Sequence, residues 1–189
     1  MTERQQAGPE TGWIRGQPRH DATVHLPPYD TVWPLLFARE AERIRALLGE
    51  HVLRLEHVGS TSVAGLAAKP IVDIVLAVAD SADEPAYVPA LERGGCRLVI
   101  REPTWHEHRV CKGPDTDVNL HVSTAGSPEV TRMTAFRDRL RANGEERALH
   151  EAEKRKLAGR TWPFMQDYAD AKGRVVEAIV ARVLAGDQP

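Results

Sequence analysis

A nearly continuous apolar run at residues 71–78 is the clearest feature of the hydrophobic pattern, and it is typical of a strand buried on both faces. A strand-like segment precedes it at residues 52–58, followed by the small-residue turn Gly59-Ser60-Thr61-Ser62 and a short helical piece at residues 63–68. Asp73 interrupts the apolar run, and burying an ionised carboxylate is costly unless it is paired, hydrogen-bonded or metal-bound. We therefore expect the main functional site of the chain in this stretch.

The pattern predicts an amphipathic helix before this stretch and a series of strands and helices after it. The first helix begins near Asp30 and ends at Gly49. The strand at residues 117–123 alternates cleanly, so its apolar side chains face one way while Asn119 and His121 face the other. Further helices are predicted at residues 85–93, 127–143, 145–157 and 163–184, and further strands at residues 96–101 and 108–112.

These elements indicate a mixed α/β (α+β) fold in a single domain. Residues 29–126 would form the core, a mixed sheet with flanking helices, and residues 127–189 a C-terminal helical segment that packs on it. Residues 1–28 are rich in Pro, Gly, Gln and Arg and lack periodicity, so they are predicted to form a flexible, partly extended N-terminal extension.

Composition narrows the class of protein but names no activity. A formal net charge of −2 without any block of Lys or Arg gives no reason to expect a nucleic-acid partner. Two cysteines are too few for a disulfide framework or a thiolate zinc site. The N-terminal residues lack the apolar segment of a signal peptide, and no stretch reaches the roughly 20 apolar residues that span a bilayer. A cytoplasmic protein without a membrane partner is the expectation.

Two features of the central stretch are candidates for chemistry. Gly59, Ser60 and Thr61 combine a permissive backbone with hydroxyl groups beside a helix start, which suits a phosphate, although the same residues also serve as an ordinary helix cap. Asp73 is either a metal ligand or a structural acid paired with Lys69, His57 or a buried amide.

Histidines and cations elsewhere in the chain complete the candidate set. His121 lies on the polar face of its strand with Asn119, so a neighbouring strand could bring it beside Asp73 in one pocket. A histidine there serves as general base or neutral metal ligand. The segment at residues 105–109, which contains His108 and Arg109, either lines the same pocket or forms an exposed edge hairpin. Two helical residues, Arg137 and Lys172, are also candidates. Lys172 falls on the apolar stripe of the last helix, where a lysine either meets an anion or extends to solvent.

A family resemblance rests on residues 29–44, 57–78, 118–123 and 136–141, together with Tyr168 and Lys172. These segments resemble the GrpB family, whose fold is similar to that of the nucleotidyltransferases of the DNA polymerase β superfamily. The resemblance implies that Gly59 and Ser60 match the nucleotide-phosphate turn and that Asp73 matches the first metal carboxylate. The chain departs from the active pattern at Val75, where a second Asp is expected.

The resemblance implies a divalent cation as cofactor. Asp73 and His121 are its expected ligands. Mg²⁺ or Mn²⁺ is the expectation from the superfamily, whereas a site made of Asp, His and Asn suits Mn²⁺, Zn²⁺ or Ni²⁺ better than Mg²⁺.

The leading hypothesis is a nucleotidyltransferase-like enzyme that transfers from a nucleotide to a small acceptor. The rival, favoured by Val75, is a catalytically degenerate module that binds a nucleotide or coenzyme, because some members of the family resemble fusions to dephospho-CoA kinase. Metal-dependent hydrolysis of a phosphate ester is a third hypothesis. The residues expected to bind phosphate are Gly59, Ser60, Thr61, Lys69, Arg109, Arg137 and Lys172, and those expected to shape the pocket are His57, His108 and Asn119.

Overall fold

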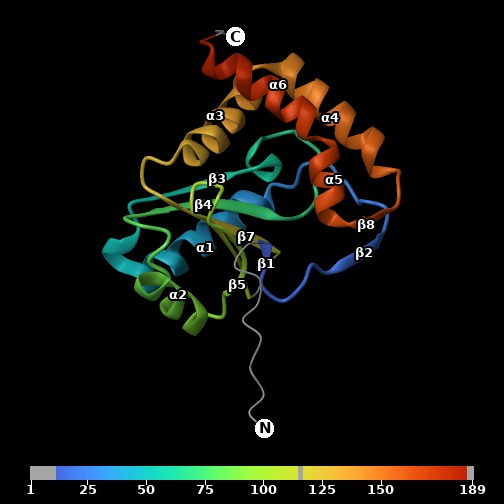
Figure 1. Cartoon of the computed structure of the whole chain (residues 1–189). Coiled ribbons are helices and arrows are strands. Elements are labelled where there is room, and N and C mark those ends of the chain that lie inside the picture. The colour runs from blue at the N-terminus through green and yellow to red at the C-terminus, as the bar shows by residue number, and fades with distance from the viewer. Residues whose placement is uncertain (1–11, 115–116, 187–189) are drawn as a thin grey trace.

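The computed structural model of the chain describes residues 12–114 and 117–186, which fold around a mixed β-sheet (Figure 1). Strand β4 pairs in parallel with β7, and every other pair in this sheet is antiparallel. The strand order is β1-β5-β6-β7-β4-β3, with β1 at Gly12–Trp13, β3 at Arg54–Val58, β4 at Val72–Val78, β5 at Arg97–Glu102, β6 at His108–Lys112 and β7 at Val118–Thr124.

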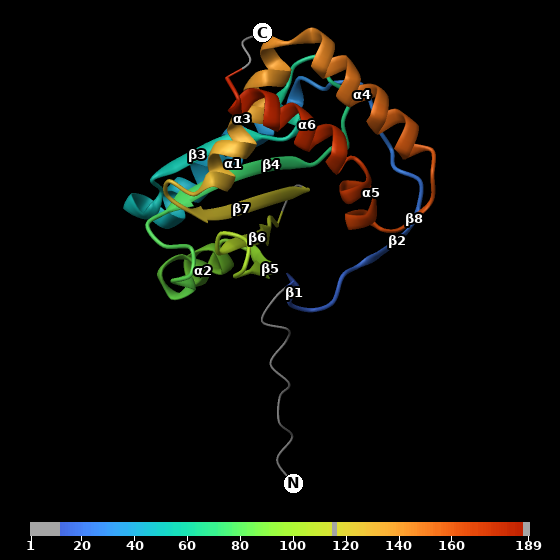
Figure 2. The ribbon, with the colours of Figure 1, turned by 45° about the horizontal axis from the view of Figure 1, so that its top comes forward.

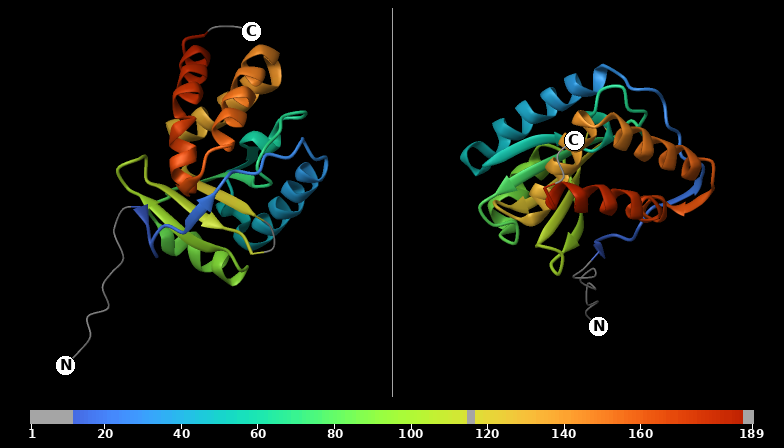
Figure 3. Two further views of the ribbon diagram at one scale, coloured as in Figure 1. Left: turned by 90° about the vertical axis from the view of Figure 1, so that its right-hand side faces the viewer. Right: turned by 90° about the horizontal axis from the view of Figure 1, so that it is seen from above.

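Helices cover both faces of the sheet (Figures 2 and 3). Helices α1 (Val32–Leu48) and α2 (Glu84–Arg93) cover one face, where alternate residues of β4 such as Ile74 and Leu76 join the main hydrophobic core. Helices α3 (Pro128–Ala142), α4 (Gly144–Ala158), α5 (Met165–Ala171) and α6 (Gly173–Leu184) lie on the opposite face. The predicted mixed α/β class is thus confirmed.

The segment at residues 63–68 is not the short helix that the sequence predicts. A single 3-10 turn, η2, spans Ser60–Ser62 and ends there. Gly65 has a φ of +77°, which a right-handed helix does not allow, so the chain bends and buries Val63 and Leu66 against Leu140 and Ile179 instead. This contact attaches the C-terminal helices to the turn that carries Ser60.

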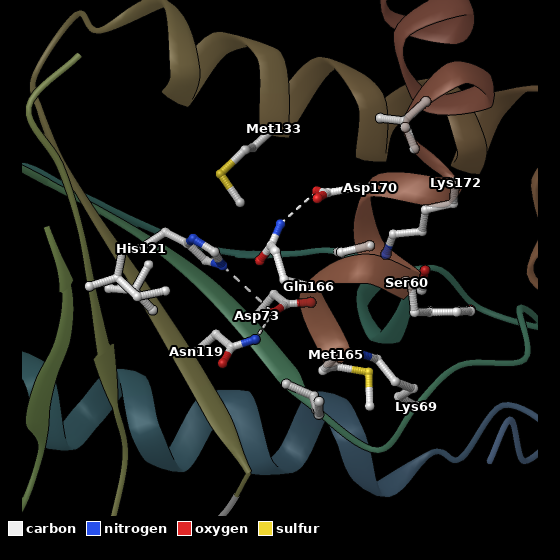
Figure 4. A pocket seen from close by; sticks show the side chains of 18 of the residues that line it. Ser60, Lys69, Asp73, Asn119, His121, Met133, Met165, Gln166, Asp170 and Lys172 are labelled. Atoms are coloured by element: carbon white, nitrogen blue, oxygen red, sulfur yellow. Dashed lines mark hydrogen bonds and ion pairs between the residues drawn. The ribbon is translucent and has the colours of Figure 1, made fainter. Parts of the chain in front are cut away.

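The last predicted helix, residues 163–184, is also different in the structure. It is divided into the short strand β8 (Trp162–Phe164), helix α5 and helix α6, with Lys172 at the junction of the two helices. Gly173, a poor helix former, begins α6. Because the helix axis breaks here, the side chain of Lys172 points toward the sheet (Figure 4).

The N-terminal segment, predicted to be a flexible extension, pairs with other strands in the part that the structure describes. Within residues 12–28, β1 extends the main sheet at β5, and β2 (Arg19–Ala22) pairs with β8. Val24 packs in a second core cluster with Trp162 and Tyr168, and its amide donates to the carbonyl of Ala158 at 3.0 Å. Residues 1–11 lie outside the described residues. Nowhere in the described part of the chain does a helix reach the length and apolar character of a membrane span.

Candidate functional site

A cavity of about 780 Å³ lies between the sheet and the C-terminal helices (Figure 4). Residues of β4, β5, β6 and β7 form its floor, and residues of α3, α5 and α6 form its roof. In the roof, Gln166 donates to Asp170 at 2.8 Å. Of the residues predicted from sequence, Gly59, Ser60, Thr61, Lys69, Asp73, His108, Asn119, His121 and Lys172 line this cavity.

Asp73 occupies the floor near the start of β4. Its Oδ1 accepts a hydrogen bond from Asn119 Nδ2 at 2.7 Å and lies 3.6 Å from His121 Nε2. Burial favours the neutral acid, but the partners His121 and Asn119 outweigh it together and hold the pKa of Asp73 below its usual value. The carboxylate is therefore ionised at neutral pH. The sequence prediction that Asp73, Asn119 and His121 meet on one face is confirmed, because the parallel register aligns Asp73 with Asn119.

Gly59 makes room for this carboxylate. Its φ of +68° and ψ of −175° lie in a region that is essentially restricted to glycine. A Cβ atom built on Gly59 would lie 2.3 Å from Asp73 Oδ2. The turn after β3 can therefore approach the head of β4 only because position 59 has no side chain.

A chain of polar contacts continues from Asp73 across the sheet. His121 Nδ1 lies 3.1 Å from His108 Nε2, and His108 Nδ1 lies 2.7 Å from Glu102 Oε2. The two imidazole rings are stacked, with their centroids 5.2 Å apart. Burial lowers the pKa of His108, and the hydrogen bond to Glu102 opposes that shift. Four neighbouring strands thus hold His121 in a fixed orientation above the floor.

Two lysines of the cavity lie near the ring of Tyr168. Lys69 Nζ lies 5.4 Å and Lys172 Nζ 5.5 Å from the centroid of its ring, within the range of a cation–π contact. Burial lowers the pKa of both, and the neighbouring charge of Lys172 brings that of Lys69 to about 8. Among the residues that the structure describes, neither ammonium has a carboxylate partner within 4.0 Å. This corner of the cavity has an excess of positive charge.

Helix α4 contributes two cavity residues that the sequence analysis did not single out. His150 and Lys154 lie one turn apart and are buried. Burial lowers the pKa of His150 to about 3, so its ring is neutral, and its Nε2 lies 3.5 Å from Ser60 Oγ. Lys154 Nζ donates to the carbonyl of Ala67, and burial with the nearby Lys172 lowers its pKa to about 7. Their spacing of four residues on an otherwise charged helix was the available signal.

Three residues predicted to act in the pocket lie elsewhere. Arg109 donates to Glu84 at 2.7 Å and to Glu107 at 3.0 Å, because the start of α2 brings Glu84 next to β6. Arg137 bonds Glu56 at 2.5 Å and the carbonyl of His57 at 2.9 Å, and so joins α3 to β3.

His57 turns toward α1, where it stacks on Phe37 with centroids 4.9 Å apart. Thr61 borders the cavity, but its hydroxyl donates to the carbonyl of Ile71 at 3.0 Å and also bonds His57. Neither side chain therefore offers the cavity a free polar group.

The donor set does not fit a resident divalent ion. The part of the chain that the structure describes has no cluster of three or more His, Cys, Asp or Glu side chains suited to a metal. Val75, at the position of the expected second carboxylate, is 0% exposed and packs with Val58 and Val130 under α3. Asp73 and His121 offer one carboxylate and one nitrogen, a poor set for Mg²⁺, which prefers hard oxygen ligands. The predicted metal stays a prediction.

Fold and cavity together define a mixed α/β protein with a ligand-sized, cation-rich cavity on one face of its sheet. The chain belongs to the GrpB family: the model described as GrpB protein matches residues 23–182.

Relatives of known sequence and structure agree with this assignment. A UPF0157 protein of Halalkalibacterium halodurans is 57% identical over 166 residues, 88% of this chain and 85% of that protein. Another, from Streptomyces coelicolor, is 46% identical over 84% of this chain and 83% of its own. The crystal structure of conserved protein GrpB from Enterococcus faecalis is similar with a TM-score of 0.66 and 26% identity, covering 82% of this chain and 98% of that one.

Replacing Gly59 by alanine is expected to destabilise the protein by more than the same change at Gly65. Both glycines have positive φ, which costs an L-residue roughly 1–2 kcal/mol. Only Gly59→Ala would also push the new Cβ against Asp73, whereas nothing lies within 4 Å at Gly65. Urea denaturation of the two variants measures the difference. Equal losses of unfolding free energy would contradict the close approach of the turn to Asp73.

Proposed function

We propose that the cavity binds a phosphorylated small molecule of the nucleotide or coenzyme class and that the protein is primarily a ligand-binding module. One observation carries this proposal: the ammonium groups of Lys69 and Lys172 face the cavity without a carboxylate partner among the described residues. A partly buried cation is costly unless its charge is balanced, so the site favours an anionic ligand. Phosphate oxygens are the natural partner for a pair of lysines.

The neighbouring groups are suited to the same ligand. The hydroxyl of Ser60 lies near these lysines, and its hydrogen-bond contact within the described part of the chain is the long one of 3.5 Å with His150. Asp73 provides one negative charge on the floor, which lies too far from Lys69 and Lys172 for an ion pair and does not balance both of them. The anion therefore meets two cations and a hydroxyl donor at one end of the cavity, and polar groups such as Asn119 along the floor.

Cavity size and relatives support a ligand larger than inorganic phosphate. A volume of about 780 Å³ falls within the range of about 300–1,000 Å³ that is usual for sites of small molecules and cofactors. A protein of Mycolicibacterium paratuberculosis named dephospho-CoA kinase is 32% identical over 177 residues, which cover 80% of this chain and 44% of that protein. That name supports a ligand from coenzyme or nucleotide metabolism.

Transfer from a nucleotide to a small acceptor is the second candidate function. It is favoured by the proximity of Asp73 and His121, which face the same cavity with 3.6 Å between carboxylate and imidazole. Val75, which replaces the expected second carboxylate, favours the binding module. Turnover of a nucleoside triphosphate that disappears in Asp73→Asn, with the fold intact, would support transfer.

Replacing Lys172 by methionine is expected to weaken phosphate binding at least tenfold, because one of the two cations is lost while the side chain keeps its length. Isothermal titration with tripolyphosphate and with nucleoside triphosphates measures the change, in chelator and in Mg²⁺, Mn²⁺ or Zn²⁺. Lys156→Met is the matched control, since Lys156 lies on the exposed side of α4 and contacts Glu153. Equal affinities for the two variants would contradict the proposal, and binding that requires a metal would favour transfer.

Binding is also expected to weaken as the pH rises. With a pKa of about 8, Lys69 is charged below that pH and loses its proton above it, and Lys172 has a lowered pKa as well. The anion binds the charged form of Lys69, so we expect the highest affinity near pH 7 and a loss of affinity toward about pH 9. The phosphate group, with a second pKa of about 6, is already ionised across this range and does not contribute to the change. Titration of Lys69→Met should show a smaller loss. Affinity that is constant or rises with pH would contradict this assignment.

A further inference from the structure

The floor of the cavity continues well beyond the phosphate end. The strand register places His121 opposite Val110, Val110 opposite Ile100, and Ile100 opposite Trp13 of β1. Four strand spacings of about 4.8 Å separate β4 from β1, so this row ends about 19 Å from the strand that carries Asp73. Along it the lining changes from charged and polar groups to the apolar side chains of Val110, Ile100 and Trp13.

Two tryptophans border this far end. Trp13 is brought there by the N-terminal segment, which is fixed by the hydrogen bond from the amide of Ile14 to the carbonyl of Val99 at 3.0 Å. Trp105 lies on the turn between β5 and β6 and is 50% exposed, although it lines the cavity. Tryptophan is highly buried on average, so the half-exposed indole ring of Trp105 beside the cavity indicates a surface available for a ligand.

The turn that presents Trp105 has an unusual backbone. His106 and Glu107 have φ values of +54° and +53°, a region that non-glycine residues rarely adopt. The turn is held by the hydrogen bond from the amide of His108 to the carbonyl of Trp105 at 3.0 Å and by the bond from Ser81 Oγ to the carbonyl of Glu107 at 2.8 Å. Such conformations persist where the surrounding structure fixes them, and they cluster at ligand sites. These bonds fix the backbone of the turn that carries Trp105 beside the cavity.

We propose that Trp13 and Trp105 form a subsite for the planar heterocyclic ring of the ligand whose phosphates bind near Lys69 and Lys172. This inference rests on the proposed function and adds the residues that would bind the ring end of an extended nucleotide or nucleotide-containing coenzyme. The two ends of the cavity match the two ends of such a molecule, an anionic group and a flat ring. Stacking on an indole face tolerates every base, so the subsite selects for a ring rather than for one base.

The test compares two kinds of probe by isothermal titration. One is tripolyphosphate, which has phosphates but no ring, and the other is a panel of the four common nucleoside triphosphates with coenzyme A. We expect at least one member of the panel to bind wild-type protein more tightly than tripolyphosphate. Trp105→Ala should weaken that ligand about tenfold and leave tripolyphosphate unchanged, and Trp105→Phe should recover most of the loss.

Leu35→Ala is the matched control, because Leu35 is 68% exposed on α1, across the sheet from the cavity. Trp13→Ala is a second variant. Because Trp13 is part of β1, its ligand affinity is compared with that of the wild type at the same fraction of folded protein, which the melting curve gives. The subsite is overturned if no member of the panel exceeds tripolyphosphate, or if neither tryptophan variant changes the binding of the ligand that does. If tripolyphosphate binding proves indifferent to Lys172→Met, the proposed function fails, whereas tryptophan variants without effect overturn only the subsite.

Discussion

One carboxylate, Asp73, joins the central strands to the turn that opens the cavity. It accepts from Asn119 on the parallel neighbour β7, and Gly59 on the turn after β3 leaves room for its second oxygen. Because the parallel pairing of β4 and β7 puts Asp73 and Asn119 side by side, His121 two residues on reaches the same floor. A side chain at position 59 or a change of register would separate these groups. The polar floor therefore depends on this single packing contact.

Charge is distributed unevenly over the cavity. On the floor, Asp73 has its own partners, and the imidazoles of His121 and His108 connect it to Glu102. The lysines at positions 69 and 172 both contact the ring of Tyr168, and the carboxylate of Asp73 attracts them from beyond ion-pair distance. Burial lowers the pKa of both lysines, and the charge of Lys172 lowers that of Lys69 further. An anionic ligand would balance the positive charge of the two lysines. The break between α5 and α6 lies at Lys172 and lets its side chain point into the cavity.

Sequence patterns predicted the sheet, the helices around it and the meeting of Asp73 with Asn119 and His121, because local periodicity and strand alternation determine these features. They did not predict the partners of Arg109 and Arg137, since Glu84 and Glu56 come into contact with them only through tertiary packing. The helix expected at residues 63–68 failed for a local reason, the positive φ of Gly65. Lys154 and His150 were missed because charged residues occur on every side of this helix, so the sequence does not show which of them face inward.

The most direct test of the account is a crystal structure with a non-hydrolysable nucleoside triphosphate, grown in chelator. The account predicts phosphate oxygens within hydrogen-bond distance of Lys69, Lys172 and Ser60, and the heterocyclic ring between the phosphates and the indole of Trp105. Phosphates bound outside the cavity would contradict a binding module that recognises its ligand by unbalanced lysine charge. So would a ligand that is absent in chelator and appears only in a second crystal with added metal, with its phosphates held by Asp73 through that metal.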